Sequence, residues 1–177
     1  TEVAGDERAA AIVGKFIAAV RRRLPLQGAR VVKTLGDGVM VHLVDPAAAV
    51  RLGVRLSEDL GRRDGLPPLR VGIHTGPAVE RGGDWFGAAV NVASRVAELA
   101  SVGEVLVTEP AVQAAGVLPG VAFEDHGERR LKNVSGPVRV YAAAAPRPEA
   151  AGVLARGPQL RPAEGAGSSL AAAGSAA

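Results

Sequence analysis

The chain has 177 residues, the length of a single domain, and its 47% hydrophobic and 3% aromatic content predicts a core of Ala, Val and Leu. The absence of cysteine excludes disulfides, thiolate metal sites and cysteine nucleophiles. The net charge of +3 is scattered, no apolar run has the length of a membrane span, and the charged N-terminus is unlike a signal peptide. We therefore expect a cytoplasmic domain without nucleic-acid or membrane contacts.

The first third of the chain predicts a helix, a hairpin and a second helix. Apolar residues at a spacing of four indicate a helix that Asp6 caps and Pro25 ends. Two β-rich runs, 30–35 and 39–43, flank a Gly-Asp-Gly turn and predict a hairpin. The Asp45-Pro46 pair is typical of a helix start, and that helix is expected to stop near Gly61.

The rest of the folded part alternates strands and helices. The pattern predicts strands at 69–75 and 104–107, a helix at 87–99, a short helix from 108, and a closing hairpin at 121–132 and 138–141. The mixed order and the hairpins favour an α/β (α+β) sandwich, with helices packed on a mainly antiparallel sheet. Residues 142–177 are rich in Ala, Gly, Pro and Ser and are interpreted as a flexible tail after a domain at 1–141.

Several polar residues stand at positions where chemistry is possible. Asp37 lies in the tight turn, where it is either an ordinary turn residue or a ligand for a hard cation. Asn91 and Arg95 are four apart and share one helix face, on which Glu98 is an alternative partner for Arg95. The adjacent Trp85 and Phe86 are typical of a packed interface or a base-binding pocket.

Four segments together resemble the catalytic domain of class III nucleotidyl cyclases, the adenylate and guanylate cyclases. They are 32–38 (VKTLGDG), 71–76 (VGIHTG), 84–95 (DWFGAAVNVASR) and 127–141, which includes Leu131-Lys132. They occur in the family's order over nearly all of residues 5–141. The resemblance implies a ferredoxin-like cyclase fold and a homodimer whose active sites lie at the interface, each chain supplying part.

The resemblance also implies a role for each matching residue. Asp37 corresponds to one of two carboxylates that hold two Mg²⁺ or Mn²⁺ ions. The purine is read by the pair Lys33 and Asp84, and Phe86 lines the base pocket. The resemblance implies that Asn91 orients the ribose, that Arg95 stabilises the transition state and that Lys132 binds the triphosphate.

The chemistry of the purine-reading pair favours ATP over GTP. Adenine presents an acceptor at N1 and a donor at its exocyclic amine, which match the Lys33 ammonium and the Asp84 carboxylate. Guanine presents the reverse pattern, and guanylate enzymes of the family typically carry Glu and Cys at these positions. The sequence therefore predicts an adenylate cyclase that converts ATP to cyclic AMP and pyrophosphate in signalling.

The chain departs from the family pattern at its beginning. The family's first metal carboxylate lies on a strand before the first helix, in a segment resembling Phe-x-Asp-h-x-Gly, which residues 1–36 do not contain. Loss of a central strand is expected to expose sheet edges and apolar surface. Three hypotheses remain open: a fragment of a full enzyme, a degenerate cyclase that binds nucleotide without turnover, and a chain that forms a composite site with a complete partner. A dimerisation or regulatory module is the non-enzymatic alternative.

Overall fold

The computed structural model describes residues 2–24, 28–62, 68–146 and 168–174. The described elements are α1 (Glu2–Arg23), β1 (Ala29–Leu35), β2 (Gly38–Leu43), α2 (Pro46–Arg62), β3 (Leu69–Thr75), β4 (Val79–Arg81), β5 (Asp84–Phe86), α3 (Ala88–Leu99), β6 (Val105–Thr108), α4 (Glu109–Ala115), β7 (Ala122–Arg130), β8 (Pro137–Ala144) and β9 (Ser168–Gly174). The order predicted from residues 1–141 is confirmed, with β4 and β5 as an additional small hairpin. Helix α1 already begins at Glu2, so the expectation that Asp6 caps it is wrong.

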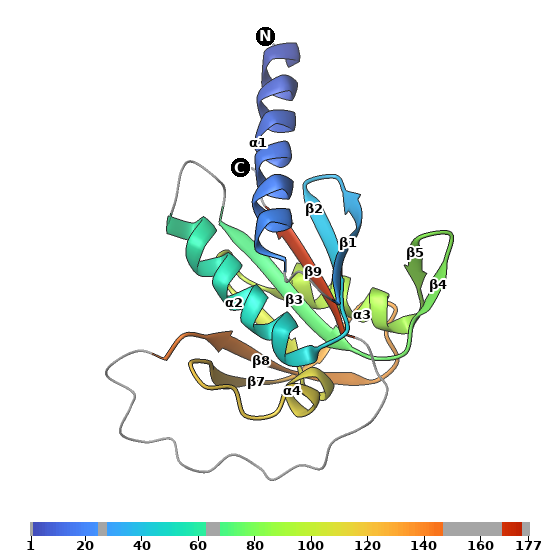
Figure 1. The fold of residues 1–177 in the computed structure, drawn as a ribbon. Coiled ribbons are helices and arrows are strands. Elements are labelled where there is room, and N and C mark those ends of the chain that lie inside the picture. Colours follow the sequence, from blue (N-terminus) through green and yellow to red (C-terminus); the bar gives the residue numbers. More distant parts are fainter. Residues whose placement is uncertain (1, 25–27, 63–67, 147–167, 175–177) are drawn as a thin grey trace.

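Seven strands form the main sheet, in the order β1-β2-β9-β3-β6-β8-β7. The pairing of β3 with β6 is parallel and every other described pairing in this sheet is antiparallel, which confirms the predicted mainly antiparallel sheet. Strands β4 and β5 form a separate two-stranded sheet. Figure 1 shows this hairpin as an arm at the side of the molecule, next to β1.

Two apolar layers cover the sheet. The larger core joins helices α1, α2 and α4 to one face, where Val41, Val71 and Ile73 are fully buried. Helix α3 packs on the other face with Leu106, Leu131 and Val140. It approaches β3 so closely that a Cβ at Gly72 would collide with the backbone of Ala97, and glycine is therefore required there.

The centre of the sheet holds the main difference from the sequence-based expectation. Strand β9 lies between β2 and β3 and pairs with every residue of both (Figure 1). Residues 168–174 therefore form a central strand where a flexible tail was expected, and β8 continues to Ala144, beyond the expected domain end at 141. Loss of a central strand was expected to expose sheet edges, but the edges of β2 and β3 that face each other are both paired with β9. The remainder of the expected tail lies largely outside the described residues.

Candidate active site

The β1–β2 hairpin brings two basic residues to one face through a β-bulge. The register runs from Val31↔Val41 to Lys33↔Met40, so one extra residue stands in β1. Directly paired residues share a face, so Lys33 lies on the face of Met40, and Arg30 lies on the face of its partner His42. Strict alternation would have placed Arg30 and Lys33 on opposite faces, because they are three residues apart.

Lys33 meets the β4–β5 arm. Its Nζ donates a hydrogen bond to Oδ2 of Asp84 at 2.8 Å, and both side chains are about one-third exposed, at 32% and 31%. The backbone N–H of Trp85 donates to the other carboxylate oxygen, Oδ1, at 2.7 Å. The hydrogen bond from Lys33 is the main cause that lowers the pKa of Asp84 below its ordinary value. The Asp84 carboxylate is therefore ionised at neutral pH.

Phe86 completes this group. The Lys33 ammonium lies 5.6 Å from the centroid of the Phe86 ring, within the range of a cation–π contact. The Phe86 side chain is 52% exposed, a large fraction for an aromatic residue. The structure thus brings Lys33, Asp84 and Phe86 together, with two opposite charges and an accessible aromatic face at one place.

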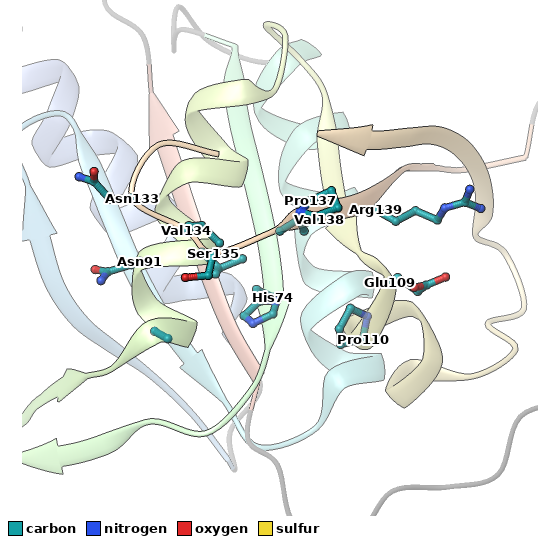
Figure 2. Close-up of a pocket in the computed structure, with 12 residues that line it drawn as sticks. His74, Asn91, Glu109, Pro110, Asn133, Val134, Ser135, Pro137, Val138 and Arg139 are labelled. Carbon is teal, nitrogen blue, oxygen red and sulfur yellow. The ribbon is translucent and has the colours of Figure 1, made fainter. Parts of the chain in front are cut away.

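Asn91 belongs to a second group, beside the loop between β7 and β8. It lines a cavity of about 470 Å³ together with residues from β3, α3, α4, this loop and β8. Figure 2 shows Asn91 and Asn133 near one another at this cavity, with His74 between them and Glu109. Lys132 immediately precedes Asn133 in the loop and is exposed. Of the expected ribose and triphosphate residues, Asn91 lines the cavity, and Lys132 adjoins a lining residue in sequence.

His74 is a residue of this cavity to which the sequence analysis assigned no role. Its Nδ1 lies 2.8 Å from Oγ1 of the buried Thr108, and burial lowers the pKa of His74 to about 4. The ring is therefore neutral at physiological pH. In the sequence, the one indication of a role for His74 was its place in the segment 71–76. A single histidine in a strand pattern cannot be distinguished, from sequence, from an ordinary core residue.

Arg95 is held by a neighbour on its own helix. Its Nη1 donates to both carboxylate oxygens of Glu98, at 2.7 and 2.6 Å. This is the alternative that the helical spacing left open. In this structure Glu98 therefore engages the Arg95 guanidinium through Nη1.

Asp37 is exposed in the turn between β1 and β2. Within the described residues no three His, Asp or Glu side chains are grouped to hold a metal ion. Strand β9, which pairs with the hairpin from Gly38 to Leu43, has the sequence SSLAAAG and contains no carboxylate. Asp37 is thus the one carboxylate in β1, β2, their turn and β9, and the described residues do not by themselves fit a two-metal site.

Comparison with known proteins defines the class. Residues 8–144 match the family model of the adenylate and guanylate cyclase catalytic domain. A pH-sensitive adenylate cyclase of Mycobacterium tuberculosis is 38% identical over 143 residues, which are 79% of this chain and 36% of that protein. An adenylate cyclase of Streptomyces coelicolor is 42% identical over 81 residues, which are 46% of this chain and 21% of that protein.

Solved structures agree with this assignment. An adenylate/guanylate cyclase/hydrolase from Silicibacter pomeroyi has a TM-score of 0.59 at 29% identity and covers 75% of this chain and 78% of its own. The adenylyl cyclase CyaB from P. aeruginosa has a TM-score of 0.62 at 20% identity over 84% and 89% of the two chains, a likeness of fold. This chain belongs to the adenylate and guanylate cyclase catalytic domain family.

It is an adenylate cyclase-like catalytic domain of class III, with the fold of that class. Some curated relatives match most of this chain and are longer proteins. The chain spans about a third of their length. The family in general uses a divalent metal ion. No described helix combines the length and the apolar character that crossing a membrane requires.

Proposed function

We propose that this domain binds ATP and converts it to cyclic AMP and pyrophosphate in intracellular signalling. The observation that carries the proposal is the Lys33–Asp84 pair, which places a donor and an acceptor 2.8 Å apart beside the exposed Phe86 ring. Adenine bridges such a pair with its N1 acceptor and its exocyclic amine donor, whereas guanine presents the reverse pattern. The names of the M. tuberculosis and S. coelicolor relatives support the same choice of substrate.

In the proposed reaction the 3′-hydroxyl oxygen forms a bond to the α-phosphorus in line with the bond that breaks. The bond from the α-phosphorus to the bridging oxygen is cleaved, pyrophosphate leaves, and the hydroxyl proton passes to solvent. Asn91 orients the ribose and Lys132 binds the triphosphate. Arg95, released from Glu98, offsets the charge that develops on the α-phosphate.

The proposal includes a homodimer with interfacial sites. The exposed Phe86 and the outward position of Asp37 leave two of the proposed site residues open to a second chain. Asp37 is the residue proposed as a ligand for Mg²⁺ or Mn²⁺.

A cyclase assay tests this function. The purified chain is incubated with ATP or GTP and either Mn²⁺ or Mg²⁺, and cyclic AMP and cyclic GMP are quantified by mass spectrometry. We expect cyclic AMP in excess, and its loss in the Arg95→Ala variant. ATP binding without product would instead favour the degenerate domain, and an excess of cyclic GMP would refute the assignment of the substrate.

A further inference from the structure

The β4–β5 arm carries two of the purine-site residues but is too small to hold itself in place. Each of its strands has three residues, and no strand pairing joins it to the main sheet among the described strands. An isolated two-stranded hairpin is marginally stable in water. Side-chain contacts must therefore fix the position of Asp84 relative to Lys33.

Besides the contacts of Lys33 with Asp84 and Phe86, four residues make such contacts. The Trp85 ring stacks on the His42 ring, with centroids 4.1 Å apart and an interplanar angle of 11°. The Arg30 guanidinium lies 5.6 Å from the Trp85 centroid, and its Nη2 lies 2.6 Å from Oε1 of Glu80. Arg30 pairs with His42 across β1–β2, and Glu80 pairs with Trp85 across β4–β5. The cross-strand pair of the main sheet thus contacts the cross-strand pair of the arm through a ring stack, a cation–π contact and an ion pair. We call Arg30, His42, Glu80 and Trp85 the Trp85 clasp.

We propose that Trp85 is a positioning residue that sets the distance of the purine-reading pair and thereby the preference for ATP over GTP. This inference rests on the proposed function. The link is direct, because the backbone N–H of Trp85 holds Oδ1 of Asp84 while Lys33 holds Oδ2. Any shift of the Trp85 backbone moves the acceptor that adenine needs.

The cost of tryptophan at this position supports a role for the stack. The indole Nε1 is buried and has no hydrogen-bond partner among the described residues. An unpaired buried donor is unfavourable, and phenylalanine would avoid that cost. His42 is suited to the stack as a neutral ring, because burial and the Arg30 charge lower its pKa and outweigh the raising effect of Glu80.

The first experiment measures, without nucleotide, how firmly the arm is held against the main sheet. Trp85 is the chain's single tryptophan, so its emission reports on the clasp in the full-length protein. We expect His42→Ala to shift the emission to longer wavelength, to increase acrylamide quenching about twofold or more, and to speed hydrogen exchange of residues 79–86. Val79→Ala, a change at an exposed site on the same arm, is the matched control and should leave these signals unchanged. Unchanged emission and exchange in His42→Ala would overturn the clasp.

The second experiment reads selectivity. ATP and GTP affinities are measured by calorimetry for Trp85→Ala, for the conservative Trp85→Phe and for Val79→Ala. We expect Trp85→Ala to lose about tenfold in ATP affinity and most of its preference over GTP, about 1.4 kcal/mol in binding. Trp85→Phe, which keeps an aromatic face on His42, should stay within about twofold of the parent. Thermal midpoints verify that each variant is folded.

The outcomes separate the two proposals. If the parent chain binds neither nucleotide, the proposed function fails. The fluorescence and hydrogen-exchange measurements alone then decide whether the clasp exists. If the parent chain prefers ATP and the folded Trp85→Ala variant retains that preference, the positioning role is wrong while the function stands. A loss confined to Trp85→Ala and restored in Trp85→Phe supports both.

Discussion

The Lys33 ammonium and the Asp84 carboxylate lie 2.8 Å apart although the two residues are 51 positions apart in the chain. The contact depends on the β-bulge that places Lys33 on the same face as Arg30, and on the Trp85 clasp that brings the arm over that face. The Lys33 ammonium and the Asp84 carboxylate are hydrogen-bonded to each other until a ligand replaces this contact. A base that satisfies both must therefore offer an acceptor and a donor side by side.

The first prediction concerns the ionisation of Asp84. Lys33→Met removes the main cause of its lowered pKa, so we expect that pKa to rise toward the ordinary 3.8. Carboxyl-carbon NMR titration of the parent and variant chains measures the change. Lys15→Met, which removes a lysine from an exposed position of α1, is the control and should leave the Asp84 titration where it was. A titration that is identical in Lys33→Met and the parent would contradict the pair.

The second prediction concerns Arg95. If Arg95 acts on the transition state, Arg95→Ala should lower kcat by about 100-fold while KM changes little. An equal loss of affinity would indicate a ground-state contact instead.

The matched variant is Glu98→Gln, which removes the charge that holds Arg95 in this structure. We expect it to raise kcat by about twofold with little change in KM, because an exposed ion pair of this kind, worth about 0.5 kcal/mol, no longer competes with the transition state for Arg95. A lower kcat in Glu98→Gln would show that Glu98 orients Arg95 productively.

The third prediction concerns β9. Ala171 pairs with Met40 on one side and Gly72 on the other, so it lies in the middle of a central strand. Ala171→Pro removes an N–H from that strand, and we expect the free energy of unfolding to fall by about 2–3 kcal/mol. Urea denaturation of Ala171→Pro and of the control Ala171→Ser, which keeps the N–H, measures the difference. Equal stability of the two variants would show that β9 does not complete the sheet in solution.

The fourth prediction concerns pH. The pKa of His74 is about 4 in the folded chain, against an ordinary value of 6.5. Between these values the unfolded chain binds more protons, so the contribution of His74 to stability is complete above pH 6.5 and is lost as pH falls toward 4. The slope reaches at most about 1.4 kcal/mol per pH unit. The free energy of unfolding is measured at about pH 7.0, above this range, and at about pH 5.0, within it. The difference between the two should be smaller for His74→Gln than for the parent, and equal differences would contradict the prediction.

Much of the fold follows from local patterns in the sequence. The Gly-Asp-Gly turn, the Asp45-Pro46 helix start and the apolar stripe of 87–99 each agree with the observed β1–β2 hairpin, α2 and α3. Lys33, Asp84 and Phe86 were grouped by resemblance, and the structure brings them together. The alternative partner of Arg95 followed from helical spacing alone.

Other features depend on long-range packing that no local pattern encodes. Strand β9 consists of Ser, Leu, Ala and Gly, which are weak strand formers, so composition indicated a tail; pairing on both edges makes it a strand. The alternation of polar and apolar residues in β1 does not reveal the bulge, because the bulge is defined only by the register of β1 with β2. His42 and Arg30 gain their importance from Trp85, which lies more than 40 residues further along the chain.

Nucleotide selectivity is the most direct test of the account, because the central claim is that Lys33 and Asp84 read adenine. Calorimetry with ATP and GTP on the parent chain and on Lys33→Glu measures it without requiring turnover. We predict that the parent binds ATP at least about tenfold more tightly than GTP, and that Lys33→Glu, which replaces the donor with an acceptor, loses or inverts this preference. A parent chain that binds GTP as tightly as ATP, or a Lys33→Glu variant with unchanged preference, would contradict the account.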